Sequence, residues 1–137
     1  MSELHRTLVE DVLYPPHDPR KASSEYRRVH KRLVYTLDEA CWICGIRHST
    51  GGKMETHHNH VEWAAANGID LDLIVRDFPE IKSGPALRQW LDSEGNMLVL
   101  CERHHRGSLT GIHSVSYPAW VLQRYQGRAW AFIVGPA

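Results

Sequence analysis

Apolar residues recur at helical spacing in two stretches near the start of the chain. The first stretch is followed by Pro15-Pro16, so the pattern predicts a helix over residues 3–14 that ends before the prolines. The second stretch predicts a helix that runs to about Leu37, with Ser23 or Ser24 as its N-cap. The two apolar stripes consist of Leu4, Leu8, Val12 and Leu13, and of Tyr26, Val29, Leu33 and Val34.

The middle of the chain alternates short segments of different kinds. Apolar runs bounded by glycine, asparagine and proline favour short helices and strands over long ones. The third helix of this region begins with a proline in its first turn, where proline is well tolerated. We expect a tight knuckle at 41–45, a strand at 53–57, helices at 63–66, 71–78 and 85–91, a turn at Gly95-Asn96 and a strand at 97–100.

The remaining pattern predicts a helix opening at 101–106, a helix at 118–125 and a final strand at 129–134. Together these elements indicate an α+β fold. A length of 137 residues is close to the commonest domain size, so we expect a single domain over 1–137. Its expected parts are an N-terminal helical region (1–38), a core (39–113) that contains a helical insertion (61–94), and a C-terminal helix and strand (114–137).

Composition is that of an ordinary globular protein, with 42% hydrophobic and 23% charged residues. No apolar run is long enough to span a bilayer, so we expect no membrane partner. The N-terminal residues lack the basic and apolar regions of a signal peptide, which favours a cytoplasmic location.

The formal net charge is zero, which argues against binding to nucleic acid by bulk charge alone. The charge is nevertheless uneven, because the segment 62–95 is acidic while 20–32 and the region after Asn96 are basic. The two basic regions could flank a polyanion, or they could simply be solvated helix faces. The basic residues of the first region are Arg20, Lys21, Arg27, Arg28, Lys31 and Arg32.

The strongest chemical signal is a pair of short motifs that contain all three cysteines. Cys41-Trp-Ile-Cys44 has C-x2-C spacing and Cys101-Glu-Arg-His104 has C-x2-H spacing. Two-residue spacers let one tight turn supply two ligands to a tetrahedral zinc ion. We therefore predict a structural Cys3His zinc site that joins two distant segments. The alternatives are three buried cysteines beside a surface histidine, or a site that uses His105 in place of His104.

A second group of residues lies between and beside these motifs. His57 and His58 are adjacent, so on a strand they point to opposite sides. One of them can hold a metal while its neighbour reaches another atom of a substrate. His105 directly follows the expected zinc ligand His104, so zinc binding would fix its backbone and bring residues 57 and 105 together.

This ordered set resembles the HNH endonucleases, the ββα-metal nucleases in their zinc-bound form. The matching residues extend over about residues 41–113, and the segment between the histidine pair and the motif asparagine is longer than is usual in that family. The resemblance implies a ββα-metal core with N-terminal helices and a helical insertion. The residues that carry it are Cys41 and Cys44, His57-His58, Asn96, and Cys101 and His104 followed by His105.

The resemblance also implies a role for each matching position. His57 and His105 would bind a catalytic divalent metal, Mg²⁺ or another ion, while zinc would be structural. His58 would be the general base that activates water, and a neutral histidine suits that task near pH 7. Asn96 would orient His58 or hold the loop of the hairpin. The substrate would be DNA, and small domains of this kind often occur in bacteriophage genomes.

Other polar residues have weaker expected roles. His113 is a candidate third metal ligand or phosphate contact, and His60 is a spare histidine. Glu55 could orient His57 as a carboxylate behind the ligand, or could be an exposed strand residue. Arg103 and Arg106 flank the histidines and could clamp phosphates, or could be a solvated helix edge.

The function expected from these residues is metal-dependent hydrolysis of phosphodiester bonds in DNA by an endonuclease. The alternative is a zinc-stapled module that binds nucleic acid or protein without chemistry. Such a module needs the four zinc ligands but has no need of an unliganded tandem histidine, so His58 is the residue that discriminates between the two hypotheses. The H-E-x-x-H pattern of zinc hydrolases is absent from the sequence.

Overall fold

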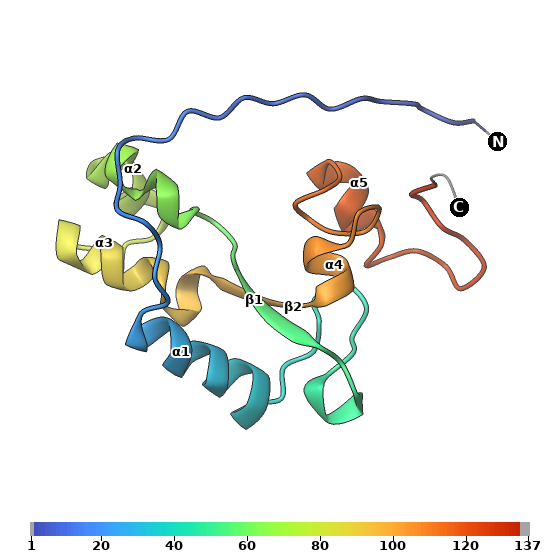
Figure 1. Cartoon of the computed structure of the whole chain (residues 1–137), viewed down its shortest axis with the longest axis horizontal. Helices are drawn as coiled ribbons and strands as arrows, with labels where there is room; N and C mark the ends of the chain where they lie inside the picture. The colour runs from blue at the N-terminus through green and yellow to red at the C-terminus, as the bar shows by residue number, and fades with distance from the viewer. Residues whose placement is uncertain (1, 135–137) are drawn as a thin grey trace.

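The computed structural model describes residues 2–134 and shows a small α+β fold. Its centre is an antiparallel pair of strands, β1 (Met54–His58) and β2 (Met97–Cys101), in a register that places Met54 opposite Cys101 and His58 opposite Met97. The helix α4 (Glu102–Arg106) follows β2 directly. In Figure 1 the strand pair runs through the middle of the molecule, with α2 and α3 toward one end and α4 and α5 toward the other.

The predicted second helix is confirmed as α1 (Ser24–Lys31), which continues as a π-helical turn over Arg32–Thr36. Ser23 is its N-cap, because its side-chain oxygen accepts a hydrogen bond from the backbone N–H of Tyr26. The apolar stripe of this helix is buried against β2. That contact forms one small core, made of Val29, Leu33, Val34 and Val99.

The long segment between the strands is helical, as the sequence predicts. It contains a 3-10 helix (Trp63–Gly68), α2 (Leu71–Asp77), α3 (Gly84–Leu91) and a short 3-10 turn (Glu94–Asn96). Asp70 caps α2 and Ser83 caps α3 through side-chain hydrogen bonds to backbone N–H groups. The segment has its own core, formed by Val61, Ile81, Leu87, Trp90 and Leu91.

The third core lies under the cysteines. The helix α5 (Tyr117–Leu122) buries Trp120 against the knuckle and the end of β2. Trp120 also stacks on Trp42, with ring centroids 5.7 Å apart. The buried members of this cluster are Cys41, Ile43, Leu100, Cys101 and Trp120.

Two predicted elements are wrong. Residues 3–14 form an extended segment without helix, and Leu4, Val9 and Leu13 are exposed. Figure 1 shows this segment as an extended strand-like trace across the top of the view, from the end with α2 to the end with α5. A helix of that length is marginal in water unless its apolar face packs on something, and here no surface covers it. The segment 129–134 is irregular for the same kind of reason, because it has no neighbouring strand to pair with in the described residues.

Within residues 2–134, none of the helices combines the length and the hydrophobicity that crossing a membrane would require.

Candidate functional site

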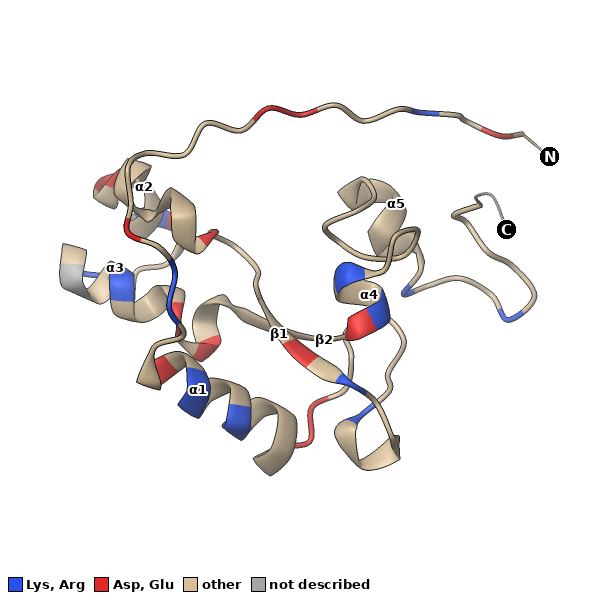
Figure 2. Ribbon diagram, in the orientation of Figure 1, with Lys and Arg blue, Asp and Glu red and all other residues tan. Residues whose placement is uncertain are grey.

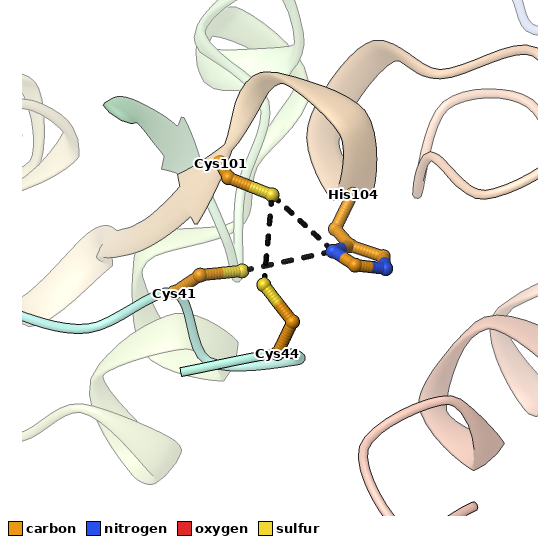
Figure 3. Close-up of side chains that lie close together, drawn as sticks. All are labelled: Cys41, Cys44, Cys101 and His104. Carbon is orange, nitrogen blue, oxygen red and sulfur yellow. Dashed lines mark hydrogen bonds between the residues drawn. The ribbon is translucent and has the colours of Figure 1, made fainter. Parts of the chain in front are cut away.

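Three cysteines and one histidine converge at the base of the strand pair. Cys41 and Cys44 come from the knuckle, Cys101 ends β2, and His104 lies on α4, so two segments far apart in sequence supply two groups each. Figure 3 shows the four side chains pointing toward one another. Their candidate ligand atoms all lie within 4.8 Å of one another.

Local structure fixes each half of this cluster. Gly45 has a φ of +80°, a conformation that suits glycine, and its N–H bonds to the carbonyl of Cys41 at 2.9 Å. The knuckle therefore turns back sharply enough to aim both sulfur atoms inward. On the other side, the indole of Trp120 donates to the carbonyl of His104 at 2.8 Å, which anchors α4 from below.

The donor set fits a zinc ion. With Zn–S bonds of about 2.3 Å and Zn–N bonds of about 2.0 Å, a tetrahedron places two sulfurs about 3.8 Å apart and a sulfur and a nitrogen about 3.5 Å apart. The Sγ atoms of Cys44 and Cys101 are 3.9 Å apart. Nδ1 of His104 lies 3.2 Å from Sγ of Cys101 and 4.0 Å from Sγ of Cys41. The cluster is consistent with a structural zinc site of the predicted Cys3His composition.

The pKa values of the buried cysteines also favour a bound cation at this cluster. Burial opposes ionisation of Cys41, yet hydrogen bonds from His104 and from backbone N–H groups lower its pKa to about 6. Burial and the neighbouring thiols raise the pKa of Cys101 to about 12. Several thiolates cannot be crowded together in a buried place without a compensating charge, and a zinc ion held by these four residues would supply it.

A second cluster lies beside the first, on the face of β1 that α4 covers. His57, His105 and His113 offer nitrogen atoms within 4.8 Å of one another. Nε2 of His105 is 3.1 Å from Nε2 of His113, and the ring centroid of His57 is 5.2 Å and 4.9 Å from theirs. His113, expected only as a candidate third member, thus joins His57 and His105. We call these three residues the histidine triad.

The triad forms because the chain folds back after α4. The N–H of Gly111 bonds to the carbonyl of Gly107 at 2.8 Å, and the N–H of Ile112 bonds to the carbonyl of His104 at 3.1 Å. A Cβ atom on Gly111 would lie 2.7 Å from the carbonyl oxygen of His105, which is too close for any side chain. Glycine at 111 therefore permits the close return that brings His113 over His105.

Glu55 holds the triad from one side. Nδ1 of His105 donates to Oε1 of Glu55 at 2.8 Å, and Arg106 makes two further bonds to the same carboxylate, at 2.9 and 2.5 Å. The carboxylate therefore orients His105, and the expectation that it orients His57 is wrong. Because Nδ1 of His105 carries the proton, Nε2 presents a lone pair to the triad. Hydrogen bonds from Arg106 and His105 outweigh burial and lower the pKa of Glu55.

Two residues of the triad, His57 and His105, favour the neutral form of imidazole, which is the form that binds metals. Burial, together with the neighbouring rings of His105 and His113, lowers the pKa of His57 to about 3. Burial also lowers the pKa of His105, although Glu55 opposes that shift. His57 and His105 can therefore offer neutral imidazoles to a divalent cation without first losing a proton.

His58 points the opposite way, as adjacent strand residues must. It is 5% exposed, and its Nε2 lies 2.9 Å from Oδ1 of Asp92, at the end of α3. The ring of Tyr26 lies against it, with centroids 5.7 Å apart. The other carboxylate oxygen of Asp92 accepts a bond of 2.6 Å from Ser23. Hydrogen bonds from His58 and Ser23 outweigh burial and lower the pKa of Asp92.

Asn96 holds the loop that leaves β1 and does not orient His58. Its Oδ1 accepts from the N–H groups of His60 and Val61 at 2.9 and 3.1 Å. Its Nδ2 donates to the carbonyls of Val61 and Leu91 at 3.0 Å each. Of the two roles expected for this residue, anchoring of the loop is the one that its contacts display.

The remaining predicted residues are spread out. Arg106 is bonded to Glu55, whereas Arg103 makes no bond to the triad in the described chain; both are exposed and line a cavity of about 590 Å³ beside Cys44 and His104. His60 is exposed and packs on Phe78, with centroids 4.8 Å apart, away from the triad. Figure 2 shows Lys and Arg on both α1 and α4, the two helices that flank β1.

Sequence reasoning missed Asp92. Its partner His58 lies 34 positions away in the sequence, and no local pattern links the two. Comparisons with protein-family models, with curated proteins and with solved structures find nothing that matches this chain.

Proposed function

We propose that this protein is a metal-dependent endonuclease that hydrolyses phosphodiester bonds in DNA, with a ββα-metal core of the HNH kind. The observation that carries the proposal is the histidine triad, which lies where the strand pair meets α4, directly beside the Cys3His cluster. A zinc-stapled adaptor would need only the four zinc ligands. A second group of side chains that could hold a metal ion, next to them, favours catalysis.

In this proposal the triad residues His57, His105 and His113 would hold the catalytic divalent ion, Mg²⁺ or a similar cation. Bound there, the ion would polarise the phosphate and stabilise the charge that develops on the leaving oxygen. Glu55 orients His105 so that its Nε2 lone pair would be available to the ion, and Arg106 neutralises the Glu55 carboxylate. Arg106 thus supports the triad through Glu55, and its side chain is also exposed.

His58 is the proposed general base. Its Nε2 is bonded to Asp92, which leaves Nδ1 as the nitrogen that can take a proton. In the reaction, a water oxygen forms a bond to phosphorus, the proton of that water goes to Nδ1 of His58, and the ester bond to the leaving oxygen breaks. That oxygen is then protonated from solvent. General base catalysis of this kind contributes about 10² to 10⁴ in rate.

A cavity of about 440 Å³ at β1 supports a substrate path. It is lined from α1 by Arg27 and His30, from β1 by Thr56, and from α4 by His105 and Arg106. β1 pairs only with β2 in the described residues, so one edge of it is unpaired and groups from both of its faces meet there. A DNA strand that crosses this edge would contact the triad side and the α1 side together.

The test is a plasmid-cleavage assay with Mg²⁺ or Mn²⁺ on the zinc-loaded protein. We expect His58→Ala to reduce cleavage at least about 100-fold and His57→Ala to reduce it by weakening metal binding, with zinc content unchanged in both. The matched control is His48→Ala, which removes an exposed histidine that contacts only Tyr35 among the described aromatic rings. Equal activity of wild type and His58→Ala would remove His58 as the base. Wild-type protein that binds zinc but does not cut DNA would favour the adaptor.

A further inference from the structure

The helical insertion between the strands ends at a series of buried hydrogen bonds that joins three segments of the protein. His58 on β1 bonds to Asp92 after α3, and Asp92 bonds to Ser23 at the start of α1. His58 and Asp92 are 5% and 8% exposed. An acid with this little access to water needs full hydrogen bonding to remain charged, and this one has a donor on each oxygen.

Resting on the function proposed above, we infer that Asp92 is a positioning residue that fixes the tautomer of His58, and that Ser23 fixes the charge and orientation of Asp92. A carboxylate only accepts hydrogen bonds, so Nε2 of His58 must carry the proton that it donates. The lone pair is then on Nδ1. The helical insertion thereby has a function, because it places Asp92 where it sets the tautomer of His58.

Ser23 fixes the direction of its hydrogen bond to Asp92, because its oxygen already accepts another bond. Its oxygen accepts the N–H of Tyr26 at 2.9 Å as the N-cap of α1, so its own hydrogen is free to point at Asp92, 2.6 Å away. The cap that begins α1 therefore also sets the acceptor that faces His58. Folding of α1, of the insertion and of β1 must all be complete before His58 takes its working form.

Tyr26 also contacts His58 and restricts the position of its ring. Its ring lies over His58, while its hydroxyl donates to the carbonyl of Thr56 at 3.2 Å and accepts from the Thr56 hydroxyl at 2.9 Å. These contacts hold the imidazole plane between α1 and α3. Rotation of the ring, which would exchange its two nitrogens, is thus opposed on both sides.

The variant Asp92→Asn should reverse the tautomer. The Ser23 hydroxyl still needs an acceptor and takes the amide oxygen, so the amide NH₂ faces His58. Nε2 must then accept, and the proton moves to Nδ1, where it blocks the base. Replacement of a carboxylate by an amide in the analogous serine-protease arrangement has this effect on its histidine.

The experiment is ¹⁵N NMR of the histidine side chains in the zinc-loaded full chain without a second metal, with His58 assigned through His58→Gln. We expect the Nε2–H form in wild type and the Nδ1–H form in Asp92→Asn. Plasmid cleavage should fall at least about 100-fold in Asp92→Asn and not in Asp72→Asn, which removes an exposed acid of α2.

The outcomes separate this inference from the proposed function. A wild-type ring with its proton on Nδ1, or on both nitrogens, would overturn the inference even in an active nuclease. An unchanged tautomer in folded Asp92→Asn would overturn it as well. A wild-type Nε2–H ring that reverses in the variant, in protein that cuts no DNA, would support the geometry and refute the nuclease. Should Asp92→Asn fail to fold, the wild-type spectrum alone decides.

Discussion

Cys44 is the residue at which zinc binding and packing can be separated. Cys41 and Cys101 are buried, whereas Cys44 is exposed, so a change there leaves the core nearly intact. Serine has the same shape but binds zinc poorly. The contribution of the metal can therefore be measured at this position with little interference from packing.

We expect Cys44→Ser to lose its zinc and at least about 3 kcal/mol of unfolding free energy, because the binding energy of a structural zinc is part of the folding energy. Metal analysis and urea unfolding measure both quantities. The control is the metal-free state, in which the variant and wild type should be equally stable. A variant that keeps one zinc per chain and melts normally would refute the zinc staple.

Glu55 offers a second test at the scale of single residues. Removing its charge in Glu55→Gln leaves Arg106 without its partner and weakens the bond that orients His105. We expect the affinity of the triad for Mn²⁺ to fall about 10-fold or more, since groups behind a ligand commonly have effects of 10- to 100-fold. Electron paramagnetic resonance of free Mn²⁺ in a titration measures this.

The matched control for Glu55 is Glu102→Gln on α4. That carboxylate is exposed and lies 4.0 Å from Arg106, but it bonds to none of the triad histidines in the described chain. The control should bind Mn²⁺ as wild type does. If Glu55→Gln also binds Mn²⁺ unchanged, the carboxylate has no part in preparing His105.

At the scale of elements, Asn96 joins the strand pair to the insertion. It is completely buried, and its amide makes four hydrogen bonds to backbone groups of the loop and of α3. Asn96→Ala would leave those groups without partners at about 1–3 kcal/mol each, offset in part by relaxation. We expect a loss of about 3–5 kcal/mol in urea unfolding.

Asn67→Ala is the comparison for Asn96. The Asn67 side chain bonds to Pro16 and Arg88 at the surface, so its removal should have an effect below about 1 kcal/mol. Equal losses in the two variants would show that the bonds of Asn96 contribute nothing beyond those of an exposed amide.

The elements differ in how far sequence reasoning could predict them. The helical pattern near Val29 gave a helix because its stripe packs on Val99, whereas the same pattern near Leu8 gave none because nothing covers it. The spacing of apolar residues shows that a helix could have an apolar face, but it does not show whether another part of the protein packs against that face. A strand at 129–134 failed likewise, since strand formation depends on a neighbour.

The Cys3His cluster and the histidine triad also differ in how far the sequence predicts them. Zinc-ligand spacing is local, because each tight turn carries two ligands, so the four residues could be identified from the sequence. His113 reaches the triad through a return of the chain at Gly111, and Asp92 reaches His58 through the packing of a whole insertion. Those contacts depend on tertiary structure and leave no local signal.

At the scale of the whole molecule, the buried histidine His57 makes the unfolding free energy depend on pH. His57 is neutral and buried, with a pKa of about 3 in the folded chain against 6.5 as its ordinary value. Between these values the unfolded chain binds one proton more than the folded chain does. Stability therefore falls as the pH decreases from 6.5, by about 1.4 kcal/mol per pH unit for this group.

We expect the unfolding free energy of the zinc-loaded protein to drop by up to about 2 kcal/mol between pH 6.5 and pH 5 through His57 alone. His57→Gln removes that titration and leaves the cysteines and Asp92 in place. Urea unfolding of both proteins at several pH values isolates the effect as the difference between the two curves. Parallel curves would mean that His57 is accessible to protons in the folded chain, and a ring that takes up protons freely near pH 6 would be a poor member of a metal-binding triad.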